Sequence, residues 1–180
     1  SEYAVYDTVP LTFKSASLAS PSASPVYTFV GASIPAHDSI TVRIKSDIQD
    51  DFKDKAVIQS FAGSRKVVQK GIWNGEWVRA SFRQFGTFQL LIDNQPPAIN
   101  APPLVITKSN RIVFTPTDNL ATISRFHAEL NGKWLRFTNN GGRSWIYTVD
   151  DRFPPGLHEL TVTVEDEAGN ITIKSWNIRR

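Results

Sequence analysis

Residues 90–100 read Leu-Leu-Ile-Asp-Asn-Gln-Pro-Pro-Ala-Ile-Asn, and they divide the chain into two halves. An alternating apolar pattern runs into this stretch, and a second strand-rich segment begins just after it. Proline has no backbone N–H, so Pro96-Pro97 cannot continue the hydrogen-bonded ladder of a preceding strand. The stretch therefore predicts a boundary between two β modules, residues 1–95 and residues 96–180.

Each half contains a short stretch that echoes the other. Residues 72–79 read Ile-Trp-Asn-Gly-Glu-Trp-Val-Arg, and residues 129–136 read Glu-Leu-Asn-Gly-Lys-Trp-Leu-Arg. Asn-Gly is the preferred pair for a two-residue hairpin turn, because both positions of that turn need positive φ. The repeated stretch predicts a hairpin in each half and indicates two β modules in tandem.

Alternation of apolar and polar residues predicts strands along both halves. In the first half the pattern is clearest at 40–45, 78–83 and 88–92, and a polar loop at 20–25 separates the earlier candidates. The second half shows short strands at intervals of about 8–12 residues, which is typical of an immunoglobulin-like sandwich. We therefore predict an all-β chain with two tandem immunoglobulin-like β-sandwich domains, of which the first is a variant sandwich.

The last predicted strand changes phase. Ile171 and Ile173 alternate with polar residues, but Trp176 and Ile178 fall on the opposite phase. An extra residue in one strand shifts the alternation by one position, so we expect a β-bulge near Lys174-Ser175.

The net charge of +3 is small and evenly spread. Residues 1–95 carry ten Lys or Arg against nine Asp or Glu, and residues 96–180 carry ten against eight. A nucleic-acid-binding domain gathers Lys and Arg on one face, and neither half shows such a cluster. No apolar run approaches the ~18 residues that a membrane-spanning helix needs. Nucleic acid and a membrane span are therefore not expected.

The chain contains neither cysteine nor methionine. No disulfide can form, but two modules of roughly this size can bury a core without one. The lack of methionine predicts a processed or excised piece of a longer protein. The first residues lack the basic and apolar regions of a signal peptide, so any export signal is expected upstream.

Catalytic motifs are missing from the sequence. The histidines His37, His127 and His158 stand at no metal-binding spacing, and no Gly-x-Ser-x-Gly elbow occurs. Asp150 and Asp151 are adjacent, and neighbours on a strand point to opposite faces, so they make a poor acid–base pair. We predict that this chain has no enzymatic activity of its own.

Calcium is the one metal for which candidate ligands exist. Ca²⁺ takes six to eight oxygen ligands from carboxylates, carbonyls and waters. Asp93 ends the first module, and Asp118 and Asp166 lie in predicted turns of the second. These three are the candidate ligands of a calcium ion at the domain junction. The alternative is that they are turn residues whose side chains bond to nearby backbone groups.

Three tryptophans are candidates for ligand binding: Trp73, Trp77 and Trp134. Exposed aromatic rings on a flat sheet can stack on sugars or peptides, whereas buried rings supply apolar area to a core. Trp73 and Trp77 flank one hairpin turn, where cross-strand aromatic pairs stabilise the sheet. A sugar platform requires that two or more rings are exposed.

Several motifs together resemble a known family. In the first half they are Tyr6-Asp7, Ile34–Asp38, Asp54–Ala56, Gly71–Trp77, Phe85–Phe88 and Ile92–Pro97. In the second half they are Leu130–Trp134, Gly156–Leu160 and Asp166–Asn170. This order and spacing resemble the C-terminal β-sandwich region of lysostaphin-type zinc endopeptidases from Gram-negative bacteria, over nearly the whole chain.

The resemblance implies a non-catalytic accessory region of an exported cell-wall metallopeptidase, in the periplasm or outside the cell. In that family the zinc ligands lie in a separate catalytic domain, and no position here matches them. The implied partners are an upstream catalytic domain and peptidoglycan. Two alternatives stay open: a carbohydrate-binding module of a surface or adhesin-like protein, and a protein-binding module that uses an exposed sheet edge.

Overall fold

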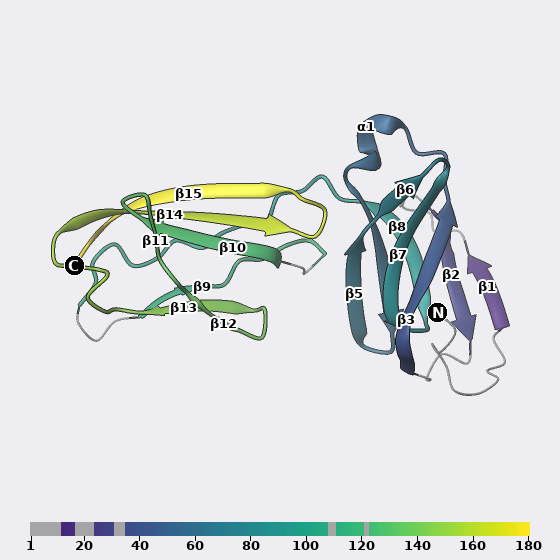
Figure 1. Ribbon diagram of the computed structural model, residues 1–180, viewed down its shortest axis with the longest axis horizontal. Helices are drawn as coiled ribbons and strands as arrows, with labels where there is room; N and C mark the ends of the chain where they lie inside the picture. The colour runs from purple at the N-terminus through teal and green to yellow at the C-terminus, as the bar shows by residue number, and fades with distance from the viewer. Residues whose placement is uncertain (1–11, 17–23, 31–34, 108–110, 121–122) are drawn as a thin grey trace. The chain divides into compact units, whose positions relative to one another are not determined.

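Strands make up nearly all the regular structure of the computed structural model, which describes residues 12–16, 24–30, 35–107, 111–120 and 123–180 (Figure 1). The chain forms two compact units, Ser1–Asn94 and Gln95–Arg180. The division falls one residue before the one expected from the sequence. Each unit is built from β-sheets, so the prediction of an all-β chain with two β-sandwich regions is confirmed.

The first unit has a five-stranded and a three-stranded sheet, in the orders β1-β2-β8-β4-β5 and β3-β7-β6. All of its pairings are antiparallel. Its elements are β1 (Thr12–Ala16), β2 (Val26–Val30), β3 (Pro35–Lys45), α1 (Asp50–Lys53), β4 (Ala56–Ala62), β5 (Arg65–Lys70), β6 (Ile72–Asn74), β7 (Trp77–Gln84) and β8 (Thr87–Ile92).

The core of the first unit follows from alternation. Along β7, Val78, Ala80 and Phe82 are buried while the residues between them are exposed, because successive side chains of a strand point to opposite faces. These three pack with residues of the other sheet, among them Phe88 and Leu90, whose side chains are fully buried.

The second unit also has two sheets, in the orders β11-β10-β14-β15 and β12-β13-β9. Its strands are β9 (Arg111–Phe114), β10 (Ile123–Leu130), β11 (Lys133–Trp134), β12 (Thr138–Asn140), β13 (Ser144–Thr148), β14 (Leu157–Asp166) and β15 (Ile171–Arg179). Asn131 and Gly132 form the turn between β10 and β11 with φ of 51° and 74°. The hairpin predicted from Asn-Gly is therefore confirmed here.

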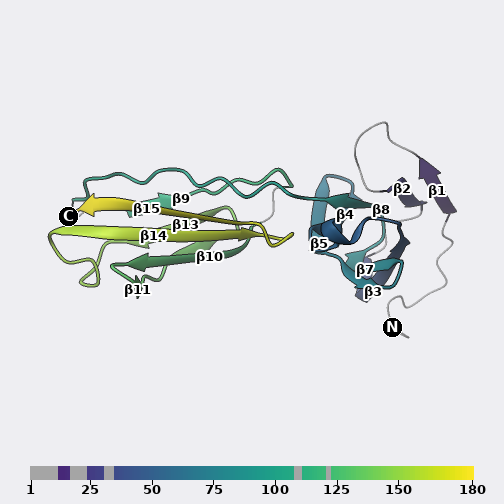
Figure 2. The same ribbon diagram turned by 90° about the horizontal axis from the view of Figure 1, so that it is seen from above.

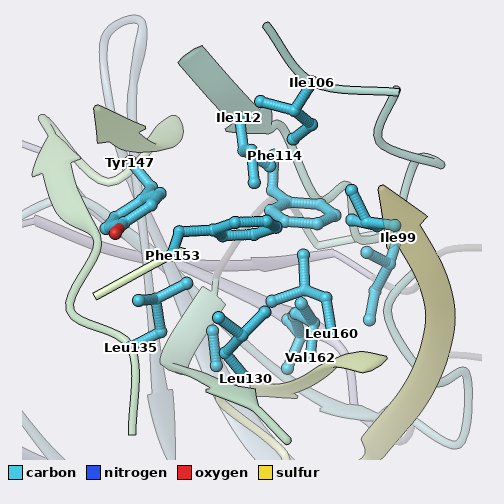
Figure 3. Close-up of a cluster of buried hydrophobic side chains, with 13 residues drawn as sticks. Ile99, Ile106, Ile112, Phe114, Leu130, Leu135, Tyr147, Phe153, Leu160 and Val162 are labelled. Atoms are coloured by element: carbon cyan, nitrogen blue, oxygen red, sulfur yellow. The ribbon is translucent and has the colours of Figure 1, made fainter. Parts of the chain in front are cut away.

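The core of the second unit combines the rings of Phe114, Tyr147 and Phe153 with aliphatic side chains such as Ile112 and Leu160 (Figure 3). Phe114 of β9 lies at its centre, with ring centroids 5.6–5.8 Å from those of Phe126, Phe137 and Trp176. Phe153 enters from the loop before β14 and is fully buried. Aromatic pairs at these spacings add to the stability that their buried area supplies.

A tyrosine fixes the loop that carries Phe153. The hydroxyl of Tyr147 donates a hydrogen bond to Oδ1 of Asp150, and the same oxygen accepts the backbone N–H of Arg152 at 3.0 Å. Burial, with a smaller contribution from this hydrogen bond, raises the pKa of Tyr147 to about 12. The same hydrogen bond lowers the pKa of the Asp150 carboxyl. The chain is thereby turned at Asp150, which directs Phe153 into the core.

The ladder between β14 and β15 runs without interruption from Glu165–Ile171 to Leu157–Arg179. The expected bulge near Lys174-Ser175 is therefore wrong. Trp176 and Ile178 point into the core, whereas Ile171 and Ile173 lie on the opposite, exposed face of the same regular strand. The apolar residues change from odd to even positions because they lie on the exposed face at the start of β15 and on the core face at its end.

Residues 95–106, which we call the edge segment, run beside β15 (Figure 2). At its far end Arg179 donates its backbone N–H to the Leu104 carbonyl at 2.9 Å. On its other side Ala98 and Thr117 exchange two backbone hydrogen bonds. The edge segment thus closes one side of the sandwich, and its residues Ile99 and Ile106 join the core.

Candidate functional site

Asp166 organises the turn from β14 to β15. Its Oδ1 accepts the backbone N–H of Asn170 and its Oδ2 accepts the side-chain N–H of Asn170, both at 2.8 Å. The Asp166 side chain is almost completely buried, and its backbone carbonyl accepts the hydroxyl of Ser124 at 2.6 Å. The turn-residue alternative raised by the sequence therefore describes at least part of what Asp166 does.

Asp118 lies close to Asp166 within the second unit. A carboxylate oxygen of one lies within 4.8 Å of a carboxylate oxygen of the other. Oδ2 of Asp118 also accepts the backbone N–H of Leu120 at 2.8 Å. Two carboxylates at this spacing repel each other, and a bound cation removes that repulsion. A carboxylate oxygen has two lone pairs, so these hydrogen bonds leave capacity for a Ca²⁺ ion.

Asp93 belongs to the first unit, where its backbone N–H donates to the carbonyl of Lys55 at 2.9 Å. The side chain of Asp93 is buried. Its role as a calcium ligand stays a prediction from the sequence.

Trp73 and Trp77 point to opposite faces of their sheet. In the hairpin register Trp73 pairs with Val78, a core residue, and Asn74 pairs with Trp77. The indole N–H of Trp73 donates to the Lys53 carbonyl at 2.9 Å, and its ring packs against the core. Trp73 therefore stabilises the first unit, and the two rings do not share a platform.

Trp77 lies on the outer face of β7 and is 47% exposed. It borders a hollow of ≈310 Å³ together with Arg43, Asn74 and Arg79. An apolar ring beside amide and guanidinium groups suits a sugar, whose faces are apolar and whose edges carry hydroxyl groups.

Trp134 is 64% exposed and lies in the second unit. It borders a hollow of ≈490 Å³ whose other lining residues include Asn131, Lys133, Asp151 and Arg152. Each unit thus carries one exposed tryptophan beside a hairpin turn. The hairpin expected in each half is present, but the Asn-Gly turn expected in the first half is wrong, because Asn74 pairs with Trp77 and Gly75-Glu76 forms the turn. In the second half Asn131-Gly132 separates the paired residues, as expected.

Comparison with known protein families accounts for both units. Residues 1–93 match the model of the Zu5-like domain. The chain belongs to the Zu5-like family. Residues 105–179 match the bacterial Ig-like domain, so the Zu5-like domain is followed by an Ig-like one. The chain is therefore a tandem of non-catalytic β-sandwich modules of a bacterial protein, and no peptidase family is among these matches.

A search of solved structures finds the fibronectin(III)-like modules of Clostridium thermocellum CbhA. The identity is 14%, the match covers 77% of this chain and 84% of that chain, and the TM-score is 0.37. No curated protein matches the chain. Within the described residues, no helix has the length and apolar character needed to cross a membrane.

Two histidines of the Ig-like domain have structural partners. Nδ1 of His158 lies 2.8 Å from the side-chain nitrogen of Asn131, and its Nε2 lies 2.9 Å from the Pro154 carbonyl oxygen. His127 lies 3.0 Å from Glu129 on the same strand. His37 lies on β3 of the Zu5-like domain. The sequence assigned none of the three to a metal site.

The sequence did not single out two arginines of the Zu5-like domain. Arg43 of β3 and Arg79 of β7 lie directly opposite each other in the register of these strands, and both are exposed. Like charges at opposed positions destabilise a sheet. Alternation along 40–45 and 78–83 places both on outer faces, but only the strand register makes them neighbours.

Proposed function

We propose that the chain is a non-catalytic accessory region of an exported bacterial cell-wall protein, which spaces an attached domain from the wall. The resemblance to the C-terminal region of lysostaphin-type endopeptidases supports a zinc peptidase domain as the attached partner. The family matches support a bacterial tandem of modules. The proposed location is the periplasm or the cell surface.

The observation that carries this proposal is the anchoring of the edge segment at its start. The carbonyl oxygens of Gln95, Pro97 and Ile99 accept hydrogen bonds from the side chains of Asn170, Thr172 and Lys174, at 3.5, 2.6 and 3.0 Å. The β8 ladder ends at Ile92. Only residues 93 and 94 thus lie between the ladder of the first sandwich and the anchored segment, and this short linker supports the spacer proposal.

Distance measurement between spin labels tests the spacer. The chain has no cysteine, so Ser64→Cys and Asn177→Cys, both at exposed positions, give one label in each unit. We expect a narrow distance distribution in the otherwise native chain. Thr172→Val removes the hydrogen bond to the Pro97 carbonyl and is expected to broaden it.

Thr161→Val is the matched control, because Thr161 bonds to Ser175 on β15 and not to the edge segment. A distribution that is already broad in the native chain contradicts the spacer.

Calcium at Asp118 and Asp166 belongs to the same proposal. Asn170, which is held by Asp166, also bonds to Gln95, so the turn that carries Asp166 is coupled to the start of the edge segment. Asp93 precedes Gln95 by two residues, and its Cα therefore lies at most about 7 Å from that of Gln95. In the same spin-label experiment, millimolar CaCl₂ is expected to narrow the distribution, and Asp118→Asn is expected to remove this response.

A second candidate function is glycan binding, and the two exposed tryptophans favour it. Trp77 and Trp134 each border a hollow of a size that suits one or two sugar rings, with amide and cationic groups beside the ring. Weak binding at both hollows would hold the modules on peptidoglycan.

Calorimetric titration with soluble fragments of digested peptidoglycan tests this function. We expect about two fragments bound per chain, and about one after Trp77→Ala or Trp134→Ala, because each variant removes one stacking surface. Ile171→Ala, which shortens another exposed apolar side chain, is the control and should keep both sites. A titration with no binding stronger than millimolar would rule out the glycan function.

A further inference from the structure

One sheet of the first unit extends beyond the other. Five described strands of one sheet face three of the other, and neighbouring strands lie about 4.8 Å apart, so the described strands leave two strand widths uncovered. Phe13 of β1 lies opposite Phe29 of β2, and Tyr27 of β2 lies opposite the buried Phe88 of β8. The register places all four on the inner face of the sheet, yet Phe13 is 58% exposed.

A groove of ≈450 Å³ follows from this overhang. One wall contains Phe13, Tyr27 and Phe29. The ring centroid of Phe13 lies 5.9 Å from that of Tyr27 and 5.6 Å from that of Phe29. The opposite wall contains all six consecutive residues from Ile40 to Lys45 of β3. Because neighbours on a strand point to opposite faces, a groove that touches all six runs along the edge of the strand.

That edge of β3 has no partner strand among the described residues. β3 pairs with β7 on one side, and no other described strand pairs with it. An edge strand exposes unpaired backbone N–H and C=O groups, which can pair with another chain. The groove therefore combines an apolar wall with a row of backbone donors and acceptors.

The charges beside the groove are positive. Arg43 and Lys45 line it, and Lys45 already forms an ion pair with Glu76 at 2.9 Å. Arg43 faces Arg79 across the β3–β7 ladder, and within the described part of the chain neither guanidinium forms an ion pair. Acidic groups placed along the β3 edge would relieve the repulsion between these two arginines.

We propose that the edge of β3 that has no partner among the described strands binds an extended segment of a partner protein in which apolar and acidic residues alternate. The segment adds a strand to the β3-β7-β6 sheet. Its apolar side chains enter the groove and cover Phe13, Tyr27 and Phe29, and its acidic side chains lie on the outer face near Arg43. Pairing along Ile40–Lys45 takes about six residues of the partner. This interaction goes beyond the spacing function and does not depend on it.

Three synthetic peptides test the proposal on the full chain. The first alternates glutamate and valine over seven residues, the second has lysine in place of glutamate, and the third is the first peptide with alternate backbone nitrogens methylated. We expect saturable binding of the first alone, measured by calorimetry. N-methylation removes the backbone donors, so strand addition predicts a loss of about tenfold or more.

A reversal of the charge at Arg43 tests whether the acidic side chains of the peptide contact this residue. Arg43→Glu places a carboxylate opposite Arg79, which suits the sheet, so the fold is expected to persist. The variant should bind the glutamate peptide about tenfold more weakly and gain affinity for the lysine peptide. Arg125→Glu, at an exposed position of the second unit, should change neither.

Three outcomes would overturn the proposal. The first is that the glutamate peptide shows no binding to the native chain at concentrations up to about 1 mM. Equal binding of the methylated peptide excludes strand addition. The third is that sodium laurate displaces the peptides and that the glutamate and lysine peptides bind with equal affinity. That result would make the groove a site for an amphiphile.

Discussion

Replacement of Phe114 with alanine is expected to lower the free energy of unfolding of the second unit by about 3–5 kcal/mol. The side chain is fully buried at the centre of the core, where it contacts the rings of Phe126, Phe137 and Trp176. These neighbours lie on three different strands or loops, so they cannot all move into the cavity that the substitution leaves. Urea denaturation followed by tryptophan fluorescence measures the change, because Trp145 stacks on Phe126.

Val113→Ala is the control for this prediction. Val113 is the neighbour of Phe114 on β9 but lies on the exposed face, so its truncation should cost less than about 1 kcal/mol. Equal losses for the two variants would mean that the aromatic cluster is not the core of this unit.

Phe88→Ala is expected to be the corresponding change in the first unit, with a loss of about 3 kcal/mol or more. Phe88 is fully buried, and its ring centroid lies 5.2 Å from that of Phe82 on the opposite sheet and 6.0 Å from that of Phe29. The ring therefore joins the two sheets of the sandwich. Its loss leaves a cavity next to the groove, and partial collapse of the groove wall should keep the cost near the lower end of the range.

Phe61→Ala separates burial from aromatic character. Phe61 lies on the neighbouring strand β4 and is exposed, so the same chemical change removes little buried area. Unfolding of the full chain by urea, read by circular dichroism, gives both values. If Phe61→Ala destabilised the chain as much as Phe88→Ala, the assignment of the core face of this sheet would be wrong.

Much of this architecture could be predicted from local patterns. Alternation identified the strands around Ile44, Phe82 and Leu90, and Asn131-Gly132 identified a hairpin, because both signals depend on neighbouring residues only. The boundary at Pro96-Pro97 was predicted from their missing N–H groups. That argument did not foresee that the carbonyl of Pro97 can still accept a hydrogen bond, here from the Thr172 hydroxyl.

Other features depend on register and on contacts between distant residues. Trp73 and Trp77 differ in exposure because the hairpin register places one on each face, and a shift of one residue would exchange them. The proximity of Asp118 and Asp166 could be suspected only because both stand in turns. The exposure of Phe13 depends on how many strands the opposing sheet contains, which no local pattern encodes.

The edge segment has a consequence for self-association. β15 is the last strand of its sheet, it is nine residues long, and it presents Ile171 and Ile173 on its exposed face. A long, apolar strand with a bare edge is a template for aggregation. Here the edge segment lies against β15, and its four prolines, Pro96, Pro97, Pro102 and Pro103, offer no N–H to an incoming strand. The segment that leads into the second unit is thus expected also to hinder the pairing of that unit with strands of other copies.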